Sequence, residues 1–316
     1  MTHALVTGAA GFIGSVLTDR LLADGVRVTG VDAFTDYYDV AFKRRNLESA
    51  VRHPAFSLLE LDLASADLAA LPVVDVVFHQ AAQPGVRGSW GVEFAGYTRA
   101  NVLATQRLLE RYKSAGLERF VFASSSSVYG DAESYPTSES ALPRPYSPYG
   151  VTKLAGEHLA LLYGRNFGLP VAALRYFTVY GPRQRPDMAF HRFCRAMLAG
   201  EPITVYGDGR QSRDFTFISD AVEANVRAWK RSAPQGVYNV GGGSQVEVLE
   251  AIALLEKSLG LKARVTFEPR PAGDPQHTRA DAARLAADLG YATTVGIADG
   301  LAAEAEWARA LYRGVR

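Results

Sequence analysis

The stretch TGAAGFIG (residues 7–14) decides the fold, because three glycines at three-residue spacing separate an apolar run from an amphipathic one. The apolar run HALVT (3–7) predicts a buried strand, and the residues after the turn predict a helix that ends near Gly25. Glycines at this spacing permit a tight turn and let backbone amides approach a pyrophosphate at the helix N-terminus. The stretch therefore predicts the first βα turn of a dinucleotide-binding sheet.

The same alternation of apolar runs and helical patterns continues along the chain. A run that is apolar throughout is typical of a strand buried on both faces, and alternating βα units favour a parallel sheet with right-handed crossovers. The further runs are VRVTGV (26–31), VDVVFHQ (74–80), RFVFAS (119–124) and PVAALRYFT (170–178). We therefore expect an α/β fold with a doubly wound parallel sheet of the Rossmann type.

The pattern changes after about residue 180, where loops rich in Pro, Arg and Gly separate individual helices. We expect residues 1–178 to form the dinucleotide-binding domain and residues 179–316 a smaller substrate-binding domain. The helix-like SDAVEANVRAWK (219–230) and the strand-like GVYNVG (236–241) lie inside the second part. They predict that residues 215–242 return to the first sheet.

Composition limits the possible functions. The 316 residues carry 34 basic and 33 acidic side chains, so the net charge of +1 provides no footprint for nucleic acid or an anionic membrane. Cys194 is the single cysteine, and the six histidines are scattered, so we expect neither a disulfide nor a metal site. No apolar run reaches the ~18 residues of a membrane span, and the start lacks a signal-peptide pattern, so we expect a cytoplasmic protein.

An acidic residue follows at the position where such a sheet binds adenosine. Asp32 ends the second predicted strand, 18 residues after Gly14. A carboxylate at this point accepts hydrogen bonds from a ribose and repels a 2′-phosphate. The sequence therefore favours NAD over NADP.

A second group of residues points to proton transfer. The serines 124–127 follow a predicted strand, and YGVTK (149–153) places Tyr149 and Lys153 one helical turn apart. A lysine ammonium and a cationic nicotinamide both stabilise a phenolate, which lets the tyrosine act as a general base. Tyr149 and Lys153 are therefore the candidate catalytic pair.

These motifs together resemble those of the extended short-chain dehydrogenase/reductase family, in particular its nucleotide-sugar epimerases and dehydratases. The resemblance is carried by TGAAGFIG, Asp32, SSSSVYG and YGVTK, and it extends through RDFTFISD (213–220), VYNVGGG (237–243) and RPAGDPQHTRAD (270–281). It implies NAD as the cofactor, a UDP-sugar as the substrate and Ser125 as a third catalytic residue beside Tyr149.

The resemblance also implies which residues contact each ligand. Gly8, Gly11, Phe12, Ile13 and Gly14 would bind the pyrophosphate, Asp32 the ribose, Asp62 and Leu63 the adenine, and Gln80, Ala81, Ala82, Tyr149, Lys153 and Tyr176 the nicotinamide side. The nucleotide of the substrate would be bound by Arg213, Arg270, Asp274, Val205 and Tyr206. The family more often has leucine at the position of Gln80.

Two residues of the serine run 124–127 distinguish the reactions of the family. Sugar 4,6-dehydratases resemble one another in having an Asp-Glu pair where this chain has Ser126 and Ser127, and UDP-glucuronate decarboxylases usually have glutamate at the position of Ser127. Both reactions are therefore disfavoured, and epimerisation at C4 remains.

Two further segments resemble the UDP-glucuronate 4-epimerases: DAFTDYYDVAFKRRNL (32–47) and RYFTVYGPRQRPDMAF (175–190). We expect Ser126, Ser127 and Thr178 to bind the C6 carboxylate, with Arg185 nearby and Arg87 on the substrate side.

Several alternatives remain open at this point. UDP-glucose 4-epimerase is the next candidate, then UDP-glucuronate decarboxylase, and a non-catalytic NAD-binding regulatory protein is a candidate from another class. The resemblance also implies a homodimer formed through helices near residues 97–115 and 149–165.

Overall fold

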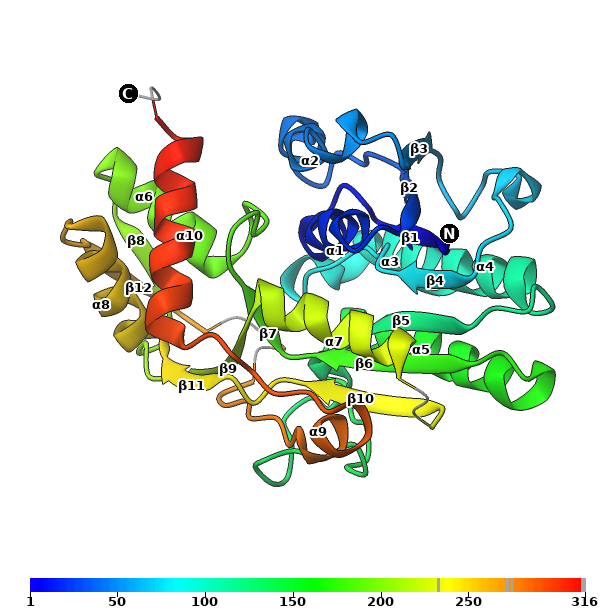
Figure 1. The fold of residues 1–316 in the computed structure, drawn as a ribbon. Coiled ribbons are helices and arrows are strands. Elements are labelled where there is room, and N and C mark those ends of the chain that lie inside the picture. The colour runs from blue at the N-terminus through cyan, green and yellow to red at the C-terminus, as the bar shows by residue number, and fades with distance from the viewer. Residues whose placement is uncertain (232–233, 271–272, 274, 314–316) are drawn as a thin grey trace.

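The computed structural model describes residues 1–231, 234–270, 273 and 275–313. Within these ranges, seven parallel strands form one sheet in the order β10-β6-β5-β4-β1-β2-β3 (Figure 1). The strands are β1 (His3–Thr7), β2 (Arg27–Asp32), β3 (Phe56–Glu60), β4 (Val76–His79), β5 (Arg119–Ser125), β6 (Val171–Tyr176) and β10 (Gly236–Val240). The Rossmann-type sheet predicted from the sequence is confirmed.

Helices cover both faces of this sheet. The helices of this part are α1 (Phe12–Ala23), α2 (Val40–Asn46), α3 (Phe94–Thr98), α4 (Ala104–Tyr112), α5 (Pro148–Phe167), α7 (Ile218–Lys230) and α9 (Ala283–Leu289). The apolar core on one face includes side chains of α1, α7 and α9, and the core on the other face includes side chains of α4 and α5 (Figure 1). Both faces of the inner strands β1, β4, β5 and β6 are thus removed from water, whereas the edge strand β3 stays partly exposed.

A smaller unit packs at one end of the large sheet (Figure 1). It contains the sheet β11-β9-β7 and the parallel pair β8 and β12. Its elements are β7 (Thr178–Tyr180), α6 (Ala189–Ala199), β8 (Ile203–Tyr206), β9 (Ser212–Phe217), β11 (Ser244–Glu247), α8 (Val248–Leu259), β12 (Val265–Glu268) and α10 (Ile297–Leu311). Side chains of α6, α8 and α10 share one apolar core with these strands.

The chain passes between the two units repeatedly. It leaves the large sheet after β6, returns through α7 and β10, leaves again before β11, and returns once more through α9 before α10. β10 pairs in parallel with β6. Where this pairing ends, the Phe177 N–H donates to the Val240 carbonyl at 3.0 Å. The carboxyl ends of β5 and β6 therefore lie where the smaller unit begins.

A buried ion pair ties the large sheet to α5. Arg175 in β6 donates from Nε and Nη2 to the two carboxylate oxygens of Glu157 at 2.9 and 2.6 Å, and the exposed fractions of the two side chains are 4% and 1%. The Ser124 hydroxyl donates to the same carboxylate at 2.6 Å. Arg175 also donates from Nη1 to the Tyr129 hydroxyl at 2.8 Å. Because each charge has several partners, the pair is satisfied without water.

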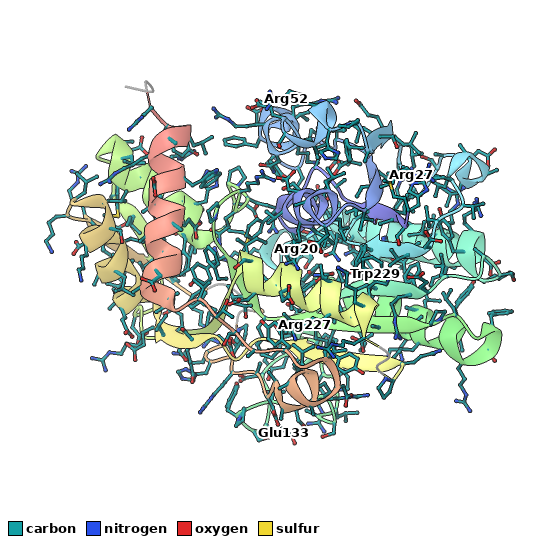
Figure 2. All side chains as sticks on the ribbon, in the orientation of Figure 1. Arg20, Arg27, Arg52, Glu133, Arg227 and Trp229 are labelled. Atoms are coloured by element: carbon teal, nitrogen blue, oxygen red, sulfur yellow. The ribbon has the colours of Figure 1, made fainter. Side chains whose placement is uncertain are left out.

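We expect the substitution Glu157→Ala to lower the free energy of unfolding by about 3 kcal/mol, because it leaves the Arg175 charge buried without its partner. Urea denaturation of the variant and the parent chain would measure this. The matched control is Glu133→Ala, which removes the carboxylate of the exposed Arg144 pair at the molecular surface (Figure 2). Equal effects of the two substitutions would contradict the prediction.

Candidate active site

Two glycines in the turn between β1 and α1 have no room for a side chain. Gly8 has a φ of +68°, and a Cβ atom there would lie 2.8 Å from the Ala81 nitrogen. A Cβ atom on Gly14 would lie 2.1 Å from the Gly8 carbonyl oxygen. Gly8 follows β1 and Ala81 follows β4, so the turn lies at the point where the strand order of the sheet reverses. Parallel α/β sheets bind their ligands at this point.

The carboxylate of Asp32 lies beside the turn. It accepts hydrogen bonds from the Ala10 N–H at 3.1 Å and the Phe34 N–H at 2.8 Å, and its exposed fraction is 8%. The Lys43 ammonium lies 3.9 Å from the carboxylate and donates to the backbone carbonyl of Thr35 at 2.8 Å. Asp32 is therefore oriented by backbone groups, and each of its oxygens keeps a lone pair for a further donor.

One cavity runs from this turn to the start of α5. Every residue for which the sequence predicts a cofactor contact lines it: Gly8, Gly11, Phe12, Ile13, Gly14, Asp32, Asp62, Leu63, Gln80, Ala81, Ala82, Tyr149, Lys153 and Tyr176. Arg185 lines it as well. The closed glycine turn, the Asp32 carboxylate and the residues that line the cavity fit a dinucleotide.

Tyr149 lies at the N-terminus of α5. The helix begins there because the Ser147 hydroxyl accepts the Gly150 N–H at 3.1 Å and Pro148 occupies the first turn. Burial raises the pKa of the Tyr149 phenol, whereas a hydrogen bond with Ser125 and the nearby Arg185 guanidinium lower that pKa. The structure thus brings together Tyr149, Ser125 and Arg185, which are far apart in the sequence.

Lys153 lies one turn further along α5 and is 3% exposed. Its ammonium is 4.8 Å from the centre of the Phe122 ring. Burial lowers the pKa of Lys153 to about 8, and the Glu157 carboxylate acts in the opposite direction. Burial lowers the pKa of the neighbouring His79 to about 3, with a contribution from Lys153. At neutral pH, His79 is therefore uncharged and Lys153 carries the positive charge.

Gln80 has a polar role that leucine could not fill. Its amide nitrogen donates to the Asn225 Oδ1 atom at 3.0 Å, and its amide oxygen accepts from the Tyr176 hydroxyl at 3.3 Å. The Tyr176 hydroxyl also donates to Asn225 at 2.9 Å. Asn225 belongs to α7, so this polar group links the cavity wall to the segment that returns from the smaller unit.

The sequence predicts that Ser126, Ser127 and Thr178 bind a sugar carboxylate. These three residues lie just beyond those that line the cavity. Ser126 and Ser127 form the short 3₁₀ turn after β5, and the Ser127 N–H donates to the Ser125 hydroxyl at 3.1 Å. A Cβ atom on Gly150 would lie 2.5 Å from the Ser127 carbonyl, so this turn abuts the start of α5. Thr178 begins β7 and pairs with Phe215. Ser126 and Ser127 therefore lie beside the start of α5, and Thr178 lies where the chain enters the smaller unit.

The residues predicted to bind the nucleotide of the substrate form two groups in the smaller unit. Arg87 reaches across from the loop after β4, and its guanidinium lies 4.0 Å from the centre of the Tyr206 ring. Val205 is 1% exposed and packs in the core of the smaller unit, so its side chain faces away from Tyr206.

Arg213 and Arg270 meet at Gln276. Arg213 donates from Nη1 to the Gln276 carbonyl at 3.1 Å, and Arg270 donates to the Gln276 side-chain oxygen at 2.7 Å. The two guanidinium groups, which are far apart in the sequence, are thus brought to one place. Asp274, for which the sequence predicts a ribose contact, lies outside the described residues.

Some residues of the cavity wall were not predicted from the sequence as site residues. They include Thr35, Tyr37, Tyr38, Lys43, Gln83, Pro84 and Ser124. The two tyrosines and Lys43 belong to the segment 32–47 that resembles one subgroup, so that motif contained the signal. Gln83 is held by Asn101, whose amide accepts the Gln83 N–H at 2.7 Å and donates to its carbonyl at 3.0 Å.

Comparison with known proteins identifies the family. The sequence profile of the NAD dependent epimerase/dehydratase family matches residues 4–241. The chain is 45% identical over 313 residues to an uncharacterized UDP-glucose epimerase, YtcB, of Bacillus subtilis, covering 98% of this chain and 99% of that protein. It is 37% identical to a UDP-glucose 4-epimerase of Mycolicibacterium smegmatis, covering 97% and 98%. The chain belongs to the NAD dependent epimerase/dehydratase family.

The fold also matches a solved structure over nearly its whole length. The crystal structure of a UDP-glucuronic acid 4-epimerase from Bacillus cereus, in complex with UDP-glucuronic acid and NAD, superposes with a TM-score of 0.95. The sequences are 46% identical, and the match covers 98% of this chain and 100% of that chain.

In the ranges given above, no group of three or more His, Cys, Asp or Glu side chains could hold a metal ion. No helix in the described part of the chain is long and apolar enough to cross a membrane.

We expect Gly14→Ala to weaken NAD binding by at least about tenfold, because the new Cβ atom would force the Gly8 carbonyl and the turn out of position. Calorimetric titration with NAD would measure this. Gly96→Ala is the matched control, because a Cβ atom on Gly96 would have no neighbour within 4 Å. Equal affinity of the two variants for NAD would show that the turn does not bind the cofactor.

We expect Ser125→Ala to move the acid limb of the kcat/KM profile to higher pH. The hydrogen bond from Ser125 lowers the pKa of Tyr149, so its loss raises that pKa and leaves less of the base deprotonated at neutral pH. Rates measured between about pH 6 and 12 would test this, since the range includes pH values on both sides of an unperturbed tyrosine pKa of about 10. Ser138→Ala removes an exposed hydroxyl and should leave the profile unchanged, and an unmoved limb in Ser125→Ala would contradict the prediction.

Proposed function

We propose that this protein is a UDP-glucuronate 4-epimerase, which interconverts UDP-glucuronate and UDP-galacturonate with tightly bound NAD. The observation that carries the proposal is that the guanidinium of Arg185 lies in the same cavity as Tyr149 and Lys153. A fixed positive charge beside the reacting group is suited to a sugar with a carboxylate at C6. The likeness to the Bacillus cereus UDP-glucuronic acid 4-epimerase supports the same substrate.

Tyr149 acts as the general base on the hydroxyl at sugar C4. Ser125 hydrogen-bonds the same hydroxyl and orients it toward the phenol oxygen. Lys153 supplies a positive charge one helical turn away and stabilises the phenolate form of Tyr149. The proton returns from Tyr149 to the opposite epimer at the end of the cycle.

NAD accepts the hydride from C4 and returns it to the other face of the 4-keto sugar, so the cofactor is unchanged over one cycle. The glycine turn 8–14 and Asp32 would hold its adenosine diphosphate, and Gln80, Ala81 and Tyr176, which line the same cavity, would lie on the side of the nicotinamide. The NAD-dependent family and the NAD in the neighbouring crystal structure support this cofactor.

The small hydroxyl side chains at Ser126, Ser127 and Thr178 accommodate the C6 carboxylate without repulsion. Elimination of water across C5 and C6 needs an acid and a base at the first two positions, and serine supplies neither charge. Arg213, Arg270 and Asp274 are proposed to bind the nucleotide, with Arg87 and Tyr206 closing over it.

The division into a dinucleotide-binding domain (1–178, with 215–242) and a nucleotide-sugar-binding domain (179–316) is part of this proposal. A homodimer through the helices near 97–115 and 149–165 is also proposed. Apolar side chains that are half exposed on these helices support it: Leu103, Val151 and Leu162.

UDP-glucose 4-epimerase remains the second candidate, because the chain is also similar to a protein of that name. The same base and cofactor site would serve both sugars, and only the group at C6 differs. Decarboxylation of UDP-glucuronate is the third candidate, and it is disfavoured by serine at position 127.

We expect the purified protein to convert UDP-glucuronate to UDP-galacturonate without added reductant, with UDP-glucose turned over at least about tenfold more slowly. Chromatography and NMR of the products would identify them, and Tyr149→Phe should reduce the rate by at least about 100-fold because it removes the base. UDP-galactose from UDP-glucose alone would establish the second candidate instead, and UDP-xylose would establish the third. A protein that retains NAD and alters neither sugar would be a regulator.

A further inference from the structure

The loop 181–187, which follows β7, carries Arg185 into the cavity and pairs it with a neighbour. Arg185 donates from Nε to one carboxylate oxygen of Asp187 at 3.0 Å and from Nη2 to the other at 2.9 Å. The exposed fractions of the two side chains are 20% and 33%. The guanidinium is therefore held by two parallel hydrogen bonds, which fix its plane as well as its position.

The pair leaves the outer end of the guanidinium available. A guanidinium has five N–H donors, and Asp187 takes the Nε hydrogen and one hydrogen of Nη2. Among the residues that the structure describes, none accepts a hydrogen bond from Nη1 or from the second hydrogen of Nη2, so these donors remain for another acceptor. A second carboxylate can thus bind the Nη1 and Nη2 atoms of Arg185 while Asp187 stays bound to Nε and Nη2.

Asp187 is itself held from across the cavity. The Tyr37 hydroxyl donates to the Asp187 Oδ2 atom at 3.4 Å, and Tyr37 lines the cavity in the segment after β2. A Cβ atom on Gly85 would lie 2.6 Å from the same hydroxyl, so the loop after β4 closes on it from the other side. Three segments that are distant in sequence therefore meet at the Tyr37 hydroxyl, which contacts the carboxylate that pairs with Arg185.

The Arg185 guanidinium is close enough to Tyr149 to lower the pKa of its phenol. Its orientation therefore matters at the reacting centre. Free rotation of the side chain would spread the positive charge over several positions, whereas the Asp187 pair confines it to one.

We propose that Asp187, held by Tyr37, is a positioning residue that aims Arg185 at the C6 carboxylate and so sets the preference for an anionic sugar. The inference rests on the proposed function, since it assumes that the substrate carries a carboxylate at C6. Asp187 acts through Arg185 and has no part in proton or hydride transfer.

The test is the dissociation constant of each sugar nucleotide from the NAD-loaded protein, in a Tyr149→Phe background that prevents turnover. We expect Asp187→Asn to weaken UDP-glucuronate by about tenfold and to change UDP-glucose by less than about twofold, because only the first ligand has a carboxylate for Arg185. Tyr37→Phe, which keeps the ring and removes the hydroxyl, should weaken UDP-glucuronate selectively by about threefold.

Asp19→Asn is the matched control. Asp19 accepts a hydrogen bond from Arg183 at 2.7 Å. Arg183 lies in the same loop as Arg185, two residues before it. The loss of the Asp19 carboxylate tests whether any carboxylate that anchors the loop has the same effect. We expect the affinities for both sugar nucleotides to stay within about twofold of the parent chain. Thermal unfolding and bound NAD, measured for each variant, show that the fold and the cofactor site are retained.

Three outcomes would overturn the positioning role. Asp187→Asn and Asp19→Asn could weaken both ligands alike, which would make Asp187 a structural anchor of the loop. Asp187→Asn could bind UDP-glucuronate more tightly, which would make Asp187 a competitor for Arg185. Asp187→Asn could also leave both affinities unchanged.

The parent chain separates this inference from the proposed function. If the parent chain binds UDP-glucuronate no better than UDP-glucose, the proposed function fails and the inference fails with it. If the parent chain prefers UDP-glucuronate and Asp187→Asn keeps that preference, the inference alone fails.

Discussion

The buried ion pair between Arg175 and Glu157 is the constraint on which the arrangement of the site depends. Two nearly inaccessible charges are stable only when every partner is in place, so the pair imposes one relative position on β6 and α5. The Ser124 hydroxyl at the end of β5 donates to the Glu157 carboxylate, and the Tyr129 hydroxyl after β5 accepts from the Arg175 guanidinium. The start of α5, where Tyr149 and Lys153 lie, is thereby held against the carboxyl edge of the sheet.

The positive charges near Tyr149 each lie close to a carboxylate. Arg185 acts to favour the phenolate form of Tyr149, whereas burial disfavours it. Lys153 lies one helical turn from Tyr149 along α5. A carboxylate acts on each of these cations: Glu157 lies one turn beyond Lys153 along α5 and raises the pKa of its ammonium, and Asp187 pairs with Arg185. Each positive charge of the candidate site thus has an acidic residue near it.

Much of this could be predicted from local patterns. The strand runs and the turn 7–14 predicted the sheet, and YGVTK predicted the helical pair Tyr149 and Lys153, because these features depend on periodicity and backbone conformation. The edge strand β3 was not predicted, because its residues alternate between half-buried and exposed and make no continuous apolar run. The polar group of Gln80, Tyr176 and Asn225 was also missed, since it joins residues up to 145 positions apart.

The sequence by itself determined the family and the cofactor class and predicted the candidate base, because each is written in a short motif whose chemistry requires those residue types at that spacing. Tertiary structure alone decided which distant side chains face that base. Arg185, Asp187 and Tyr37 come from two loops separated by nearly 150 residues, and no local pattern specifies that they meet. Their meeting depends on how the smaller unit packs on the sheet, which is a sum of many nonlocal contacts.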